Sequence, residues 1–105
     1  MSYVVVIRIQ VESDPSEYES LIQDFRFECL AEDSGMEEFR ICSTLDDEQG
    51  FLVVQIFTSE DAHQQHMNSP LVQKFLETLH MRNFKMGVIM MGGQEIVNTL
   101  PGLLN

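Results

Sequence analysis

The sequence contains few basic residues, few cysteines and no long hydrophobic run. Among its 105 residues, six are Lys or Arg and seventeen are Asp or Glu, so the formal net charge is −11. A surface with this charge repels phosphate groups and anionic lipids. The composition therefore argues against nucleic acid and against a membrane surface as partners. The acids are spread along a predicted helix, which is typical of a solvated face.

The cysteines and the short apolar runs indicate the cell compartment in which we expect the protein. Cys29 and Cys42 lie in different predicted elements without the spacing of metal ligands, so we interpret them as free thiols in a reducing compartment. Residues 3–7 are apolar, but Arg8 ends this run well short of the length of a signal peptide or a membrane span. We therefore expect a cytoplasmic protein.

Hydrophobic periodicity predicts the elements of the first half of the chain. Residues 3–12 are rich in β-branched side chains and predict a strand with one face apolar throughout. Asp14 and Pro15 then form a helix-start signal, and apolar positions recur at helical spacing until about residues 32–35. Two strands follow, at residues 37–45 and 51–58, joined by a polar loop of about five residues.

The second half of the chain predicts two short helices and one more strand. Ser59 is suited to cap the first of these helices, and Pro70 to begin the second. Residues 84–91 predict a fourth strand, which Gly92 and Gly93 break.

The predicted order is strand, helix, strand, strand, helix pair, strand, within one domain spanning residues 1–105. The core of this domain covers about residues 3–92, and a tail of residues 93–105 follows. A βαββαβ order indicates an α+β, ferredoxin-like fold with an antiparallel sheet and helices on one face. Because one chain leaves the other face of the sheet uncovered, we expect a homodimer.

The segment from Phe57 to Pro70, FTSEDAHQQHMNSP, resembles the signature of the antibiotic biosynthesis monooxygenase (ABM) family. In that family a strand ends in an aromatic residue, a small helix carries a His, and Ser-Pro opens the next helix. Residues 32–40 are similar to the family's link between its first helix and second strand, with EDSG at 32–35 in place of Glu-Pro-Gly. The resemblance covers about residues 3–92 and implies a dimeric α/β barrel. The known activities of the family include cofactor-free oxygenation of quinols and phenols, haem degradation and sugar isomerisation.

Departures from the family pattern narrow these activities. The strand before the small helix usually carries Glu and Trp, where this chain has Gln55 and Phe57. In the haem-degrading branch, Trp occupies the position of His66, and the haem-ligating His falls at the position of Phe75. A phenyl ring cannot ligate iron, so haem degradation is not expected. We expect neither a metal nor another cofactor.

His66 is the candidate catalytic residue. The resemblance places it at the mouth of a pocket between the helices and the sheet. Imidazole changes charge near neutral pH, so His66 is suited to take a phenolic or enolic proton. The resemblance implies that the resulting electron-rich anion passes an electron to dioxygen without flavin or metal. The alternative is a structural His that caps backbone groups of residues 67–70.

Three further residues are candidates for substrate binding. Gln55 and Phe57 lie two positions apart and therefore face the same side of their strand. The Gln55 amide needs a partner if buried, which either a ligand or a neighbouring backbone group supplies. Phe57 either lines the pocket or belongs to the core. Arg40 is either a clamp for an anion or carbonyl, or the ion-pair partner of a surface acid.

Several other residues have the chemistry of ligands or of pocket lining. His63 and His66 are spaced as a helical metal-ligand pair, but no third ligand accompanies them. Arg8 is a candidate for the dimer face. A group of methionines near the end of the chain is interpreted as adaptable core or pocket lining: Met86, Met90 and Met91.

We predict a small homodimeric ABM-type enzyme, a cofactor-independent monooxygenase acting on a quinol or on a phenolic or carbonyl small molecule. The alternatives are an isomerase, a non-catalytic dimer that binds a small molecule, and a dimer with a purely structural role. An enzyme requires His66 in an open cavity. If the dimer has a purely structural role, we expect no cavity as large as the roughly 300 Å³ that a drug-sized ligand occupies.

Overall fold

The computed structural model describes residues 1–96, which form a four-stranded sheet and three helices. In chain order the elements are β1 (Tyr3–Val11), α1 (Pro15–Glu32), β2 (Met36–Thr44), β3 (Asp47–Phe57), α2 (Glu60–Met67), α3 (Pro70–Met81) and β4 (Met86–Gln94). This order confirms the predicted βαββαβ arrangement, with α2 and α3 as the helix pair. Most of the predicted tail, residues 97–105, lies outside the described residues.

The sheet is antiparallel throughout, in the order β2-β3-β1-β4. β1 is an inner strand, with Val5 opposite Gln55 of β3 on one side and Gly92 of β4 on the other. Every second residue from Val5 to Val11 is buried, whereas Arg8 is exposed. The predicted apolar face of this strand is therefore confirmed, and it is the face that meets the helices.

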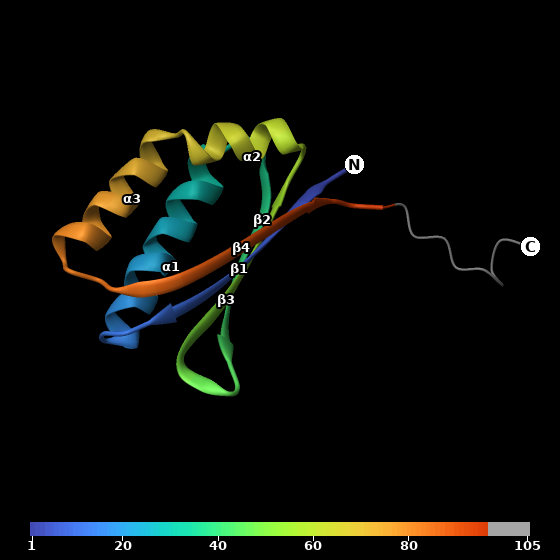
Figure 1. The fold of residues 1–105 in the computed structure, drawn as a ribbon. Coiled ribbons are helices and arrows are strands. Elements are labelled where there is room, and N and C mark those ends of the chain that lie inside the picture. The colour runs from blue at the N-terminus through green and yellow to red at the C-terminus, as the bar shows by residue number, and fades with distance from the viewer. Residues whose placement is uncertain (97–105) are drawn as a thin grey trace, which may run out of the picture.

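All three helices cover the same face of the sheet (Figure 1). The buried residues of α1 and α3 recur at helical spacing: Tyr18, Ile22, Phe25, Cys29, Val72 and Leu79. Leu76 follows Val72 at helical spacing in α3, but it is 52% exposed. It stands on the open side of the helix layer, because no helix among the described residues covers the inner face of β4.

The predicted helix starts are confirmed by their caps. Asp14, Ser59 and Ser69 precede α1, α2 and α3, and each side chain accepts a hydrogen bond from a backbone N–H of the first turn. Such a cap stabilises its helix by about 1 kcal/mol. The caps at Ser59 and Ser69 fix where α2 begins and where α3 takes over, and they thereby set the position of His66.

The β2–β3 hairpin is tighter than the sequence predicts. β3 begins at Asp47 and the turn consists of residues 45–46, so the expected five-residue loop is wrong. The Thr44 hydroxyl donates to the carbonyl oxygen of Asp47 at 2.9 Å. A Cβ at position 50 would overlap this hydroxyl, so Gly50 is a strand residue that permits a close approach.

β4 is also longer than predicted, because Gly92 and Gly93 do not break it. They pair with Val5 and Val4 of β1, and the strand continues to Gln94. The ring of Tyr3 lies over Gly92, where any Cβ would overlap the tyrosine hydroxyl. The glycine is therefore there for packing within the sheet and not for strand termination.

The face of the sheet opposite the helices is uncovered by residues 1–96 (Figure 1). Its apolar side chains come from β1, β3 and β4: Val4, Val6, Leu52, Val54, Ile56, Ile89 and Met91. Met91 is 67% exposed, and Arg8 lies in the same face. As for the helices of this region, none combines the length and the apolar character needed to cross a bilayer.

Candidate active site

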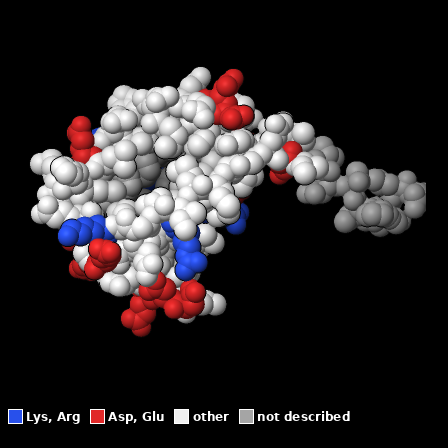
Figure 2. Space-filling model, in the orientation of Figure 1, with Lys and Arg blue, Asp and Glu red and all other residues white. Residues whose placement is uncertain are grey.

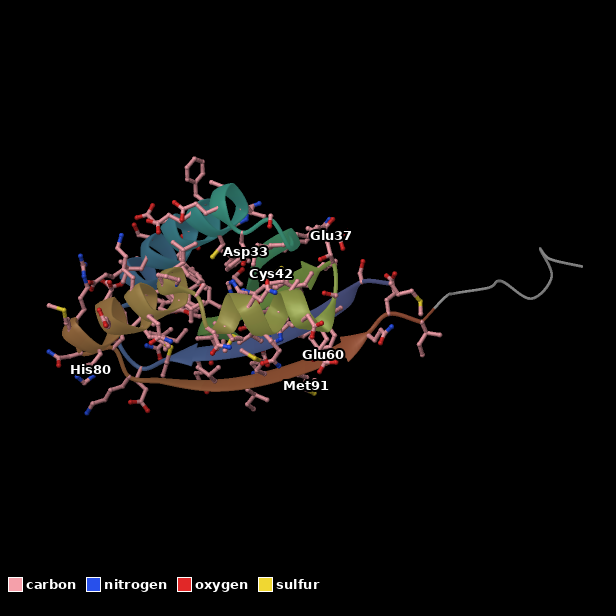
Figure 3. All side chains as sticks on the ribbon, turned by 90° about the horizontal axis from the view of Figure 1, so that it is seen from above. Asp33, Glu37, Cys42, Glu60, His80 and Met91 are labelled. Atoms are coloured by element: carbon pink, nitrogen blue, oxygen red, sulfur yellow. The ribbon has the colours of Figure 1, made fainter. Side chains whose placement is uncertain are left out.

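His66 lies in the last turn of α2 and is only 3% exposed. Its Nδ1 is 2.8 Å from Oδ2 of Asp33, the residue that ends α1. The two side chains are 33 positions apart in the sequence, and the packing of α1 beside α2 brings them together. Figure 3 shows Asp33 at the end of α1 that faces α2. A buried imidazole thus has a carboxylate partner on a neighbouring element.

The Asp33 carboxylate is fixed from the backbone. The N–H of Asp33 donates to the carbonyl oxygen of Cys29 at 2.8 Å, and Oδ1 accepts from the N–H of Gly35 at 3.3 Å. Oδ2 remains for His66. An ionised carboxylate only accepts hydrogen bonds, so this network assigns the proton of a neutral His66 to Nδ1.

The loop that carries Asp33 packs directly on α2. A Cβ at Gly35 would stand 2.6 Å from the Cβ of Ala62 in α2, which is closer than two carbon atoms approach. The carbonyl oxygen of Gly35 accepts from the N–H of Thr58 at 2.9 Å and ties the loop to the start of α2. The absent side chain of Gly35 therefore allows the approach that places Asp33 against His66.

With the proton on Nδ1, Nε2 of His66 carries a free lone pair. Nε2 makes no hydrogen bond to a described residue. Within residues 1–96, the fully enclosed side-chain nitrogen and oxygen atoms that lack a partner belong to His63 alone. Nε2 of His66 is therefore not sealed in, and it borders open space.

His66 lines an inner cavity of about 150 Å³ between the helices and the sheet. Its walls are almost entirely aliphatic and aromatic, and no Lys, Arg, Asp or Glu of the described residues lines it. The polar lining residues are Tyr18, Gln55 and His66. Figure 2 shows the face hollowed between α3 and β4, with a largely uncharged rim. The volume is half of the roughly 300 Å³ of a drug-sized pocket, so the inner cavity suits a smaller ligand.

Gln55 and Tyr18 give the inner cavity two further hydrogen-bonding groups. Gln55 lies on β3 and is 4% exposed, and its amide has no hydrogen-bond partner among residues 1–96. The expected alternative, an amide bonded to neighbouring backbone, is not what the structure contains. Burial raises the pKa of Tyr18, so its phenol stays protonated at neutral pH. A ligand in the inner cavity thus meets an amide, a phenol and an imidazole.

His66 also borders an outer groove, a surface depression of about 400 Å³. This groove is polar and carries both charge signs, with Glu32, Asp33 and Lys74 among its lining residues. The imidazole therefore stands in a wall between the outer groove and the inner cavity. The inner cavity is the better candidate for chemistry, because it holds the unpaired amide and excludes charged groups.

Comparison with known proteins places the chain in a family. The sequence matches the model of the antibiotic biosynthesis monooxygenase family over residues 2–78. The chain belongs to the ABM family. This confirms the family that the segment FTSEDAHQQHMNSP predicts. Sequence comparison with curated proteins found no significant match.

Solved structures share the ABM fold at low sequence identity. SnoaB from Streptomyces nogalater, a cofactor-independent oxygenase, is 19% identical with a TM-score of 0.78, covering 95% of this chain and 97% of that one. A Caulobacter crescentus CB15 protein, provisionally named an antibiotic biosynthesis monooxygenase, is 15% identical with a TM-score of 0.80 and 91% coverage of both chains. These likenesses confirm the ferredoxin-like ABM fold.

Phe57 lies behind the site and not in the wall of the inner cavity. It is fully buried, and its ring centroid is 5.0 Å from that of His63 and 5.2 Å from that of His66. The expectation that Phe57 lines the pocket is corrected, since it is absent from the lining of the inner cavity. Its place in this ABM domain is to pack against both imidazoles of α2.

Arg40 is also outside the site. β2 alternates, so Phe39 is buried under the helices while Arg40 is exposed on the other side. Nε of Arg40 donates to Oε2 of Glu38 at 3.0 Å, with both side chains largely in solvent. The alternative reading of Arg40, an ion-pair partner of a surface acid, is confirmed. An exposed pair of this kind contributes less than about 1 kcal/mol.

His63 is buried on the same helix without any partner. Its ring stacks on Tyr3 at 5.4 Å and packs on Phe57, and both nitrogens are enclosed without a hydrogen bond. Burial lowers the pKa of His63, and His66 lowers it further, while Glu60 opposes the change. Nowhere in residues 1–96 do three His, Cys, Asp or Glu side chains gather as a metal site requires.

Some methionines and cysteines of this ABM domain lie in the interior, and others lie on its surface. Met86 and Met90 line the inner cavity as predicted, whereas Met91 lies on the uncovered face of the sheet. Both cysteines are free. Burial, reinforced by the charges of Asp33 and neighbouring glutamates, raises the pKa of Cys29 to about 12. Cys29 is therefore an unreactive thiol in the core.

Sequence reasoning missed Asp33 and Tyr18. Asp33 has the character of a helix-stop residue, and it is one, since it ends α1. Its second role depends on a contact across 33 positions that no spacing rule contains. Tyr18 has the spacing of the apolar positions of α1, where its ring does lie, and the position of its hydroxyl depends on the tertiary structure.

Proposed function

We propose that this ABM-family protein is a cofactor-independent monooxygenase of a phenolic or quinol small molecule, with His66 as general base. One observation carries the proposal: the imidazole of His66, which Asp33 holds at Nδ1, lines an apolar cavity. The same cavity holds the unpaired amide of Gln55. The proposal is supported by the likeness of the fold to SnoaB, a cofactor-independent oxygenase.

In the proposed reaction, Nε2 takes the proton of a substrate hydroxyl and leaves a phenolate in the inner cavity. The imidazolium formed is stabilised by the Asp33 carboxylate, which itself stays ionised. The phenolate gives one electron to dioxygen, and the radical pair recombines at a ring C–H carbon. With the proton returned from His66, this gives a hydroperoxide, and loss of water leaves a carbonyl at that carbon. One oxygen atom ends in the product and the other in water.

The lining of the inner cavity favours an uncharged substrate. A carboxylate or phosphate there would lose its hydration without meeting a cation, since the described lining holds no Lys or Arg. A neutral phenol loses little on entry and finds hydrogen-bonding groups in Gln55 and Tyr18. The phenolate forms only next to His66, where its counter-charge is produced in the same step. The apolar walls also favour oxygenation of a phenol over isomerisation of a sugar, whose several hydroxyls would each need a hydrogen-bond partner there.

A homodimer belongs to the same proposal, with a second copy covering the uncovered face of the sheet. The apolar side chains of β1, β3 and β4 on that face supply the surface. Val6 lies opposite Val54 and Met91 within it. Val6→Lys is therefore expected to convert a dimer into a monomer in sedimentation velocity, while Gln73→Lys on exposed α3 leaves it dimeric. A wild type that sediments as a monomer would contradict this part.

The test of the function is oxygen uptake and product formation on a panel of hydroquinones and phenols. His66→Ala is expected to lower turnover by about a hundredfold or more, the scale of general base catalysis. His80→Ala is the matched control, because His80 is exposed on α3 (Figure 3) and is expected to leave turnover unchanged. Wild-type protein that binds phenols without consuming oxygen would replace the enzyme by a non-catalytic ligand-binding dimer.

A further inference from the structure

Phe25 of α1 and Phe75 of α3 form a stacked aromatic pair between the two helices. Their ring centroids are 4.2 Å apart and their planes differ by 11°. Phe39 of β2 packs edge-on against Phe25, at 5.9 Å and 79°, and holds it from the side of the sheet. Phe25 is buried and Phe75 is half-buried. The pair is thus a two-ring wall fixed at its inner end and accessible at its outer end.

This wall separates the inner cavity from a side hollow of about 140 Å³ between α1 and α3. Phe25 and Phe75 line both spaces, and no other described residue does. The far side of the side hollow is polar, with Asp24, Lys74 and Thr78 among its lining residues. Removal of one ring of the pair would therefore join an apolar cavity to a space that opens on solvent.

We propose that the Phe25–Phe75 pair is the specificity determinant that restricts the inner cavity to single-ring phenols. This deepens the proposed function and rests on it for the identity of the ligand as a phenol. An apolar cavity of about 150 Å³ holds a molecule the size of benzene. The inner cavity has this volume, and the aromatic pair closes it towards α1, so a second ring directed that way requires the space that the pair occupies.

Substitutions in the sheet wall of the inner cavity would disturb the fold more than a substitution of Phe75. Ile7 and Val53 belong to paired strands of the sheet, where neighbouring strands fix the backbone on both sides. Phe75 instead belongs to α3, in the helix layer, and is half-buried. Its ring is the part of the wall that a substitution removes with the least change to the sheet.

The proposal is tested by binding without turnover, using 4-methylphenol and 2-naphthol under anaerobic conditions. Isothermal titration is expected to show the wild type binding 4-methylphenol at least about tenfold more tightly than 2-naphthol. Phe75→Ala is expected to shift this ratio by about tenfold or more in favour of 2-naphthol. Phe84→Ala is the matched control, since Phe84 is also half-buried and lines neither space. It is expected to keep the wild-type ratio.

Each outcome decides the role of the pair. A wild type that binds both phenols equally or binds neither, or a Phe75→Ala variant with the wild-type ratio, would overturn it. If Phe75→Ala does not fold, Phe75→Leu removes the stacked ring and keeps an apolar side chain, and a smaller shift in the same direction is expected. Because dioxygen is absent, a shifted ratio supports the size filter even where no oxygenation is found. Oxygen uptake without a shifted ratio counts against the filter alone.

Discussion

The surroundings of His63 and His66 differ, although both imidazoles lie on α2 three residues apart and both pack on Phe57. His63 is enclosed between Tyr3 and Phe57, and neither of its nitrogens has a partner. His66 has Asp33 at Nδ1 and open space at Nε2. Burial is common to the two, so burial does not decide which imidazole can move a proton. A partner that fixes the tautomer and a cavity beside the ring decide it.

The electrostatic consequences of the two surroundings are opposite. A proton on His63 would place an uncompensated charge among aromatic rings, which is costly. A proton on His66 would lie beside a carboxylate that the end of α1 holds in place. The closed surroundings of His63 therefore keep an imidazole neutral, whereas those of His66 place a carboxylate beside the ring.

Phe57→Ala is the most severe test of this comparison, because it removes the ring that both imidazoles share. The loss of a fully buried phenyl ring is expected to lower the free energy of unfolding by about 3–5 kcal/mol. Urea unfolding measures it. Phe27→Ala, which truncates a Phe that is 74% exposed on α1, is expected to stay within about 0.5 kcal/mol of wild type. Equal effects of the two substitutions would show that Phe57 is not the common support.

Substitution of Asp33 acts on the surroundings of His66 alone. Asp33→Ala leaves the buried Nδ1–H without an acceptor and is expected to lower the free energy of unfolding by about 1–3 kcal/mol. Asp33→Asn keeps an acceptor oxygen but not the charge, so we expect a smaller loss of stability and a retained Nδ1–H tautomer in ¹⁵N NMR spectra. It is expected to lose oxygen uptake, since the imidazolium has no counter-charge. An Asn variant with wild-type turnover would remove the charge of Asp33 from the mechanism.

The smallest effect is expected at His63 and depends on pH. Burial holds the pKa of His63 in the folded state below the ordinary 6.5, so below that pH the unfolded chain binds more protons than the folded one. Stability from His63 is therefore complete above about pH 6.5 and is lost as the pH falls, by at most about 1.4 kcal/mol per pH unit. Urea unfolding at about pH 7.5 and pH 5 measures the difference between the two values.

His63→Phe is expected to reduce that difference, because a phenyl ring fills the same apolar site without a proton to exclude. His80→Phe on exposed α3 serves as the control and is expected to keep the wild-type pH dependence. If His63→Phe and His80→Phe have the same pH dependence, His63 is not held neutral by its surroundings.

The sequence predicted the helices well because their signals are local. The caps at Asp14 and Ser59 act within one turn of the chain, and the structure confirms both, as it confirms the helix start that Pro70 predicts. The strand ends near Gly50 and Gly92 were misjudged. In the sequence alone, a glycine indicates a turn. In the structure, both glycines lie where a Cβ would overlap a side chain of a neighbouring strand.

The sequence predicted only some of the residues of the candidate site. The ABM resemblance singled out His66 and strand alternation added Gln55, and the structure places both in the lining of one apolar cavity. The same reasoning proposed Phe57 and Arg40, of which one packs behind the imidazoles and the other faces solvent. Strand alternation tells which face a residue occupies, but it does not tell whether that face ends in a cavity or in packed core.

The sequence by itself determined the βαββαβ order, the helix starts, the apolar faces and the family, since these depend on residues close together in the chain. The tertiary structure alone decided that Asp33 meets His66, that His63 has no partner, and that Phe25 and Phe75 divide two spaces. Each of these depends on two elements meeting at one distance. That distance is set by the packing of whole helices on the sheet, which no local pattern encodes.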